Sequence, residues 1–375
     1  METPTHQLPV PDCTFTGHYF AVGFSPWKKP LVRDFLPEAR LTFVRSLRRV
    51  PAGAALVAWG RSLDPALAAA IRSGHLPSDT RVLRIEDGFL RSVGLGAGLA
   101  RPLSWVLDPV GIHYDASAPS ALEQLLQDHP FPVPLLQRAQ RLIDRILALN
   151  LTKYNVGSTP WSPPPTRKPL LLVPGQVESD ASLQFGTQTI RTNLALLQAV
   201  RAAHPDAFLL YKPHPDVAAG LRQRGPLEAQ ARAACDALVT DVPMGDLLQA
   251  VDQVHVMTSL TGFEALLRQK KVVCYGSPFY AGWGLTEDRL PQPRRQRSLS
   301  LPQLVAGALL CYATYVHPGS RQRIEAEDAL ETLAVWRKNP PAFRSNFIES
   351  CVTKLYRTFV FCQNKLYDLQ RSHSI

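Results

Sequence analysis

The chain has 375 residues, 45% hydrophobic and 19% charged, a composition that excludes a disordered protein and favours two globular domains. Its net charge of +10 suits an anionic ligand or surface. No zinc-finger spacing or RNA-binding aromatic signature accompanies this charge, so we expect no nucleic-acid partner.

The first 154 residues alternate predicted strands and helices. The predicted helix at 64–74 has Asp64 at its start and Gly74 at its end. This βαβ alternation predicts a mostly parallel sheet, and therefore a Rossmann-like domain over residues 1–154. The predicted strands lie within 18–29 and at 40–47, 55–60 and 80–87, and a further short helix is predicted at 30–37.

The second half repeats this alternation after a linker. Residues 155–168 are rich in proline, serine and threonine, which predicts an interdomain linker. Residues 169–310 predict a second Rossmann-like domain, with strands at 169–176 and 207–215, a helix at 192–205, and helix, strand, helix and strand within 246–276. The sequence thus predicts an α/β fold with two Rossmann-like domains facing across a cleft.

The C-terminal segment, residues 311–375, is predicted to form helices that pack across the domains. Its stretch 347–369 is amphipathic and basic. Packing against the protein's own domains is the favoured interpretation, and peripheral contact with the inner face of the inner membrane is the alternative. No apolar run of about 18 residues occurs, so no membrane-spanning helix is predicted.

The cysteines indicate a reducing compartment. All six are scattered, none forms a CxxC pair, and they are too sparse for a disulfide framework. We therefore expect free thiols and a cytoplasmic location.

Two carboxylates end the predicted strand at 80–87, at the place where ligands of doubly wound folds bind. Glu86 and Asp87 precede Gly88, and two neighbouring carboxylates can divide into an acid and a base because each raises the other's pKa. The structural alternative is a helix cap or an ion pair with Arg84 or Arg91.

The loop "PGQVESDAS" at 174–182 follows the first strand of the second predicted domain. Gly175 permits a tight turn, and Gln176, Glu178 and Asp180 follow it. Asp180 is a candidate nucleophile or base, or it caps the next helix.

The loop "YKPHPDV" at 211–217 carries a lysine and a histidine beside each other. Two prolines restrict the backbone around His214, and Lys212 supplies a positive charge. This combination suits a phosphate, while the alternative is a loop histidine without a ligand.

The stretch "MTSLTGFEALL" at 257–267 is predicted to pass from strand to helix. Ser259, Thr261 and the helix N-terminus are candidates for phosphate binding, and Glu264 is a candidate for ribose hydroxyls. The alternative is a capping box, because Thr261 and Glu264 have its spacing.

Other site motifs are excluded. The glycines at 94–98 lack the G-x-G-x-x-G spacing of dinucleotide sites, and no Walker A, Asp-x-Asp or HExxH motif occurs. We therefore expect neither a metal nor a bound cofactor.

Five segments in this order resemble the KpsC-like capsule-polysaccharide β-Kdo transferases. They are RIEDGFLRSVGLG, PGQVESDAS, YKPHPD, TSLTGFEALL and CYGSPFYAGWGLTEDR, and the resemblance runs from about Phe20 to Arg289. It implies a GT-B-like arrangement of the two domains, a CMP-Kdo donor (Kdo is 3-deoxy-D-manno-oct-2-ulosonic acid), retention at the anomeric carbon and no required metal. The implied acceptor is a glycolipid or polysaccharide.

The resemblance also implies roles for individual residues. It makes Asp180 the nucleophile and gives acid/base work to Glu86 and Asp87, without deciding between these two. The implied donor-binding residues are Gln176, Lys212, His214, Pro215, Ser259, Thr261, Gly262 and Glu264.

Two rival functions stay open from the sequence. One is an inverting transferase for another CMP-sugar, similar to sialyltransferases, in which the same residues would hold CMP. The other is a non-catalytic protein of capsule export or assembly that keeps the fold.

Overall fold

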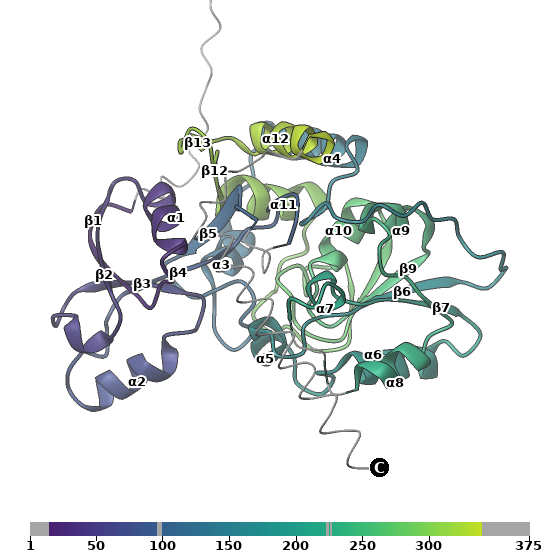
Figure 1. Cartoon of the computed structure of the whole chain (residues 1–375), viewed down its shortest axis with the longest axis horizontal. Helices are drawn as coiled ribbons and strands as arrows, with labels where there is room; N and C mark the ends of the chain where they lie inside the picture. Colours follow the sequence, from purple (N-terminus) through teal and green to yellow (C-terminus); the bar gives the residue numbers. More distant parts are fainter. Residues whose placement is uncertain (1–14, 96–99, 223–224, 226, 340–375) are drawn as a thin grey trace, which may run out of the picture.

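The computed structural model describes residues 15–95, 100–222, 225 and 227–339. Two β-sheets lie side by side, each with helices packed against it, and the C-terminal part of the chain returns to the first sheet (Figure 1). Within these residues, no helix has the length and hydrophobicity needed to cross a membrane.

The first sheet is mixed, with four parallel strands beside three antiparallel ones. Its strand order is β13-β12-β5-β4-β3-β1-β2. The loops after β1, β3 and β4 leave the parallel part at the same edge, which is the edge that faces the second sheet (Figure 1). The strands are β1 (Gly17–Val22), β2 (Ala39–Val44), β3 (Ala55–Trp59), β4 (Val82–Asp87), β5 (Ser104–Asp108), β12 (Ala313–Val316) and β13 (Arg323–Ile324).

The second sheet is fully parallel, with the order β11-β10-β9-β6-β7-β8. In chain order this is 3-2-1-4-5-6 read from β8, the order of doubly wound nucleotide-binding sheets, whose ligand crevice opens between the first and fourth strands. Here these strands are β6 and β9. The strands are β6 (Leu170–Pro174), β7 (Phe208–Lys212), β8 (Ala237–Leu238), β9 (Gln253–Val256), β10 (Lys271–Cys274) and β11 (Glu287–Asp288).

The helices follow the strands as the sequence predicts for βαβ units. Strand β6 is buried along its whole length, since α-helices cover both faces of a parallel sheet. The helices are α1 (Lys28–Phe35), α2 (Asp64–Arg72), α3 (Ala121–Asp128), α4 (Val133–Ala148), α5 (Ala181–Gly186), α6 (Asn193–Ala203), α7 (Pro215–Ala218), α8 (Glu228–Ala233), α9 (Met244–Ala250), α10 (Thr261–Leu267), α11 (Leu301–Val305) and α12 (Ala326–Lys338), with a 3₁₀ turn at Leu47–Arg49 and a π-helical turn at Ala306–Tyr312.

One hydrophobic core connects the two halves. It contains Val106 of the first sheet and Val254 of the second. The ring of Phe89, which follows β4, lies 4.6 Å between centroids from the tilted ring of Phe279, which follows β10. The relative position of the sheets is therefore fixed by buried aromatic contacts as well as by the linker.

The segment predicted to form C-terminal helices begins instead with two strands, within residues 313–324. Strand β12 pairs antiparallel with β5 and then with β13, so this segment completes the first sheet. The sequence ATYV contains β-branched and aromatic residues, and without β12 the edge of β5 would lack a partner. Helix α12 packs against α4, where Arg138 bonds Glu327 at 2.8 Å. The predicted helix at 347–369 lies outside the described residues.

Candidate active site

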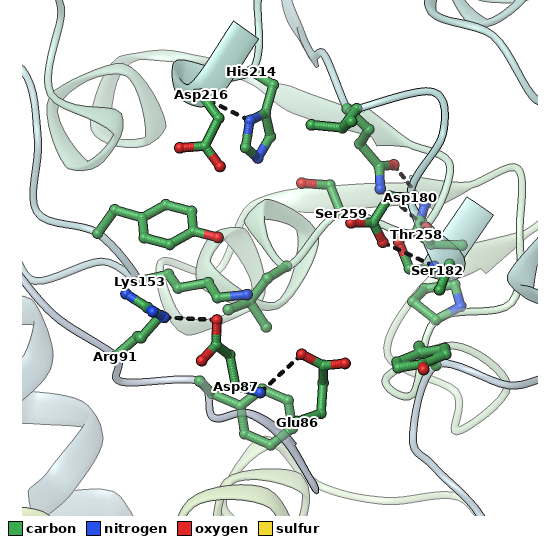
Figure 2. A pocket seen from close by; sticks show the side chains of 18 of the residues that line it. Glu86, Asp87, Arg91, Lys153, Asp180, Ser182, His214, Asp216, Thr258 and Ser259 are labelled. Carbon is green, nitrogen blue, oxygen red and sulfur yellow. Dashed lines mark hydrogen bonds and ion pairs between the residues drawn. The ribbon is translucent and has the colours of Figure 1, made fainter. Parts of the chain in front are cut away.

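A cleft of about 1110 Å³ lies between the carboxyl edges of the two sheets. We call the carboxyl ends of β1, β3 and β4, with the loops that follow them, the first wall, and those of β6, β7 and β9 the second wall. The cleft brings together side chains predicted from all four polar loops (Figure 2). Of the predicted residues, those that line it are Glu86, Asp87, Gln176, Asp180, Lys212, His214, Pro215, Ser259, Thr261 and Glu264.

Asp87 is an ion-paired carboxylate. Its Oδ2 lies 2.7 Å from Nε of Arg91, a side chain that is almost fully buried. Burial alone would raise the pKa of Asp87, but the positive charges of Arg91, Lys153 and Lys28 outweigh it and hold that pKa below its usual value. The ion pair with Arg91 that the sequence offered as an alternative is confirmed for Asp87.

Glu86 has the opposite character. Among the described residues it makes no ion pair, since Arg84 bonds Asp64 instead, and its Oε1 accepts the Asp87 N–H at 3.0 Å. Burial, followed by the negative charge of Asp87, raises the pKa of Glu86 to about 8. Glu86 is therefore mostly protonated at neutral pH, and can donate a proton into the cleft.

Gly60 makes room for the Glu86 carboxyl group. It follows β3 with φ of 45°, a left-handed conformation that favours glycine. A Cβ at this position would lie 3.0 Å from Oε2 of Glu86 and would collide with the hydroxyl of Tyr114. The turn after β3 therefore shapes the first wall around the carboxyl group.

Asp180 faces Glu86 from the second wall. Its Oδ1 accepts the Ser182 N–H at 2.9 Å, which caps α5 and fixes the side chain at the cleft. The negative charge of Asp180 is close enough to contribute to the raised pKa of Glu86. The predicted cap is confirmed. Because it engages Oδ1 through a single N–H, it is compatible with a chemical role for Oδ2.

His214 presents one defined nitrogen to the cleft. Its Nδ1 accepts the Asp216 N–H at 3.1 Å, which caps α7 and assigns the ring proton of a neutral imidazole to Nε2. Burial, followed by the positive charge of Lys153, lowers the pKa of His214 to about 4, so the ring is neutral at pH 7. His214 therefore offers an uncharged N–H donor at the cleft (Figure 2).

Two predicted donor-binding residues use their polar groups to hold neighbouring loops. The Gln176 amide donates to Oγ1 of Thr258 at 3.0 Å and accepts the Thr258 N–H at 2.9 Å, which connects the loops after β6 and β9. Nζ of Lys212 donates to the carbonyls of Thr240 and Val242 at 2.9 and 2.8 Å. Both side chains order the second wall, and their contact with a donor stays a prediction.

The capping-box alternative for residues 261–264 is wrong. Helix α10 begins at Thr261, and its N-cap, Leu260, makes no side-chain cap. Instead, Oε1 of Glu264 accepts the N–H of Lys153 at 2.7 Å, and burial raises the pKa of Glu264. We call residues 149–169, which connect α4 to β6, the crossing segment. Glu264 thus anchors this segment at Lys153.

Ser259, Thr261 and Gly262 lie at the start of α10. Oγ of Ser259 accepts the Thr261 N–H at 3.2 Å and donates to Oγ1 of Thr261 at 3.2 Å. Gly262 does not line the cleft. A side chain there would collide with the Tyr280 ring, so Gly262 lets the helix pack closely against that ring.

Two lysines at the cleft were missed by the sequence analysis. Lys28 follows β1 and lies over the Trp59 ring, 3.0 Å from its centroid, and burial lowers its pKa to about 8. Because Lys28 follows a predicted strand, its position in the sequence could have identified it as a candidate site residue. Lys153 lies beyond helix α4 in the crossing segment, where no strand end marks it.

Metal ligands do not gather in the described ranges: no three histidine, cysteine or acidic side chains lie close enough together to hold an ion. Cys235 and Cys274, which lie in these ranges, are free thiols, as the sequence predicted.

Comparison with protein families gives a match over most of the chain. The family model described as "Capsule polysaccharide biosynthesis protein" matches residues 54–160 and 142–317. The capsule polysaccharide modification protein LipA of Neisseria meningitidis is 43% identical over 357 residues, which are 92% of this chain and 50% of LipA. The chain therefore spans about half the length of this relative.

Two solved structures are similar over their whole length. Thermosulfurimonas dismutans KpsC, titled beta Kdo 2,7 transferase, is 39% identical with a TM-score of 0.70, covering 85% of this chain and 99% of that one. Thermosulfurimonas dismutans KpsC, titled beta Kdo 2,4 transferase, is 31% identical with a TM-score of 0.70, covering 84% and 97%.

Proposed function

Because this chain belongs to the KpsC-like family of capsule polysaccharide biosynthesis proteins, we propose that it is a retaining glycosyltransferase that moves Kdo from CMP-Kdo to a glycolipid or polysaccharide acceptor. The observation that supports this chemistry is that two adjacent carboxyl groups differ in their ion pairing and in the direction of their pKa shifts. Asp87 is ion-paired, whereas Glu86 has no ion-pair partner in the described ranges, has a raised pKa of about 8 and lies opposite Asp180.

The arrangement of the sheets supports a GT-B enzyme. A doubly wound second sheet supplies the crevice between β6 and β9, and the parallel part of the first sheet faces it with its own carboxyl edge. In this interpretation the second wall holds CMP and the first wall meets the sugar and the acceptor.

The first half of the proposed reaction forms a covalent sugar–enzyme intermediate. Oδ2 of Asp180 attacks the anomeric carbon, C2 of Kdo, while the bond from C2 to the phosphate oxygen breaks. Glu86 gives its proton to the departing phosphate, and CMP leaves. The neutral N–H of His214 is placed to donate to the same phosphate, where negative charge develops.

The second half transfers the sugar to the acceptor. Glu86, now a carboxylate, takes the proton of the acceptor hydroxyl, whose oxygen attacks C2 as the bond to Asp180 breaks. Two displacements at one carbon retain its configuration, and Glu86 and Asp180 return to their initial states.

The donor contacts that we propose are those of the second wall. Ser259, Thr261 and Lys212 hold the phosphate together with His214 and its neighbour Pro215. Glu264 and Gln176 border the ribose. We further propose that the protein works in the cytoplasm, in peripheral contact with the inner membrane where the lipid-linked acceptor lies.

The test is transfer by the purified protein. CMP-Kdo generated in situ and a short synthetic glycolipid acceptor are incubated with it, and NMR gives the anomeric configuration of the product. A β-Kdo product is expected. An inverted product would contradict the retaining mechanism, while transfer from CMP-sialic acid alone would contradict the donor. CMP binding without transfer to any acceptor would favour an assembly protein.

A further inference from the structure

Six positively charged side chains line the cleft among the described residues, and three of them have hydrogen-bond or ion-pair partners in the protein. They are Lys28, Arg61, Arg91, Lys153, Lys212 and Arg222. A CMP-linked sugar acid brings two anionic groups, a phosphate and a sugar carboxylate, and each needs a cation or an N–H donor. The carboxylate of such a sugar is attached to the anomeric carbon itself, so its partner has to lie beside Glu86 and Asp180.

Three of these cations are already engaged within the protein. Arg61 bonds Asp64 at 2.5 Å and Asp115 at 2.6 Å. Arg91 is paired with Asp87, and Lys212 donates to two backbone carbonyls. Each of these three is held in place by partners within the protein, so its charge is already partly used there, and Lys212 is the residue that we propose for the phosphate.

Besides Lys153, two cations remain as possible partners of the sugar carboxylate, Arg222 and Lys28, and both are less well placed for it. Arg222 is exposed, which puts its charge in contact with solvent. The ammonium of Lys28 lies over the Trp59 ring on the first wall. Its pKa of about 8 reflects burial, which the nearby Asp87 and Glu86 offset only in part.

Lys153 combines a central place with an uncommitted ammonium group. Its side chain reaches into the cleft between Asp87 and His214 (Figure 2). Its charge is felt on both walls, because it helps to lower the pKa of Asp87 on one side and that of His214 on the other. In the described part of the chain, Nζ makes no hydrogen bond and no ion pair within 4.0 Å, and its contact is with the neighbouring Tyr154 ring, 5.2 Å to the centroid.

The backbone holds Lys153 from both halves of the protein. Its N–H donates to Oε1 of Glu264 at 2.7 Å, and its carbonyl accepts the N–H of Ser92 at 3.2 Å. Asn155 completes the turn by donating to the Ser92 carbonyl at 3.1 Å. These bonds fix the backbone from which the Lys153 side chain extends into the cleft, which lowers the conformational entropy lost when its ammonium binds a charged group.

We propose that Lys153 binds the carboxylate on the anomeric carbon of the donor sugar acid. This inference rests on the proposed function and assigns the residue that selects ulosonic acids over neutral sugars. An ion pair there keeps the carboxylate turned away from Oδ2 of Asp180, which would otherwise approach a like charge. It also neutralises the carboxylate without any movement of Arg91 or Lys212.

The experiment compares two probes that differ only in this charge. Free Kdo and its C1-amide are titrated into the full chain with saturating CMP, followed by ligand-observed NMR. The wild-type protein is expected to prefer Kdo by about tenfold or more, the size of one charge-assisted hydrogen bond. Lys153→Met is expected to bind both probes equally, with an unchanged affinity for CMP, while Lys153→Arg keeps part of the preference.

Lys28→Met is the matched control, since it also removes one lysine charge from the cleft. It is expected to keep the preference for Kdo. A preference that survives in Lys153→Met, or that disappears equally in Lys28→Met, would overturn the assignment. Should Lys153→Met fail to fold, Lys153→Gln keeps a polar head and answers the same question.

The outcomes separate this assignment from the proposed function. A wild-type protein that transfers Kdo but shows no preference for the carboxylate would remove Lys153 from carboxylate binding and leave the transferase standing. A wild-type protein that neither transfers Kdo nor binds either probe would overturn both.

Discussion

The two walls of the cleft differ in how their polar groups are used. On the second wall most side chains bond to the protein itself, as Gln176 does to Thr258 and Lys212 to two carbonyls. The first wall and the crossing segment contain Glu86, whose pKa is strongly raised, and Lys153, whose ammonium has no hydrogen bond among the described residues. A wall that is internally bonded keeps its shape for binding, whereas unpaired groups are available for proton transfer and for charge recognition.

The sharpest test of this division is Asp180, the second-wall residue to which we give chemistry. Asp180→Ala is expected to lower transfer by at least about 10³-fold, since the proposed nucleophile is lost. CMP affinity, measured by calorimetry, is expected to stay within about threefold because the phosphate contacts lie elsewhere. Asp180→Asn, which keeps the α5 cap, separates the loss of chemistry from the loss of the cap. Full activity in either variant would remove Asp180 from the mechanism.

Glu86 is expected to give the next largest effect. Glu86→Gln should lower kcat by about 10²-fold or more, because general acid–base catalysis contributes on that scale. In the wild-type protein kcat/KM should decline above about pH 8, where Glu86 loses its proton, and this decline should be absent in Glu86→Gln. A pH–rate profile that is identical in both proteins would transfer the acid/base role to another group.

The same carboxyl group gives a prediction for stability. The folded protein binds the Glu86 proton more tightly than the unfolded chain does, so this group lowers the free energy of unfolding as pH rises from about 4.5 to about 8. Glu86→Gln removes this pH-dependent contribution, because glutamine does not ionise. Urea denaturation at pH 5 and pH 8 should therefore show a smaller loss in the variant, and an equal loss would contradict the buried, protonated state.

Arg91 tests the ion-paired half of the first wall. Arg91→Met leaves the half-buried Asp87 without its ion-pair partner, and is expected to cost about 3 kcal/mol of unfolding free energy. The double variant Arg91→Met with Asp87→Asn should recover much of this loss, because the uncompensated charge is gone. Denaturant titration measures both. A loss under about 1 kcal/mol in the single variant would show that the pair is dispensable.

His214 is expected to give the smallest of these effects. His214→Ala should weaken CMP binding by about tenfold, which corresponds to one lost hydrogen bond to a charged phosphate. Because the imidazole is already neutral at pH 7, CMP affinity of the wild-type protein should not change between pH 6 and pH 8 through this residue. An unchanged affinity in His214→Ala would refute the phosphate contact.

The sequence predicted the parts of this site that follow buried strands. Strands β4, β6, β7 and β9 are apolar runs that end in polar residues, glycine or proline, and their loops do meet at the cleft. The hydrophobic pattern of a strand and the turn-forming residues at its end are local properties of the sequence, so they can be recognised without the structure. Glu86 and Asp87 could be identified together, but not told apart, because their difference depends on where Arg91 and Lys28 lie in space.

The features that the sequence did not predict depend on distant pairing. Lys153 is placed by Glu264, 111 positions later, and no local pattern marks either partner for this role. Strand β12 likewise depends on pairing with β5. The four residues ATYV are too few to determine a strand by themselves, so their conformation depends on the edge of β5 that they pair with.

The return of β12 to the first sheet sets the order in which the protein can be completed during synthesis. Strands β1–β5 leave the ribosome first, yet one edge of their sheet stays open until residues 313–324 have emerged, after the whole second sheet. During that interval β5 is an unpaired edge that can pair with another nascent chain. A chain that stops at residue 310 keeps this edge permanently, and we expect it to aggregate even though every cleft residue discussed above is present.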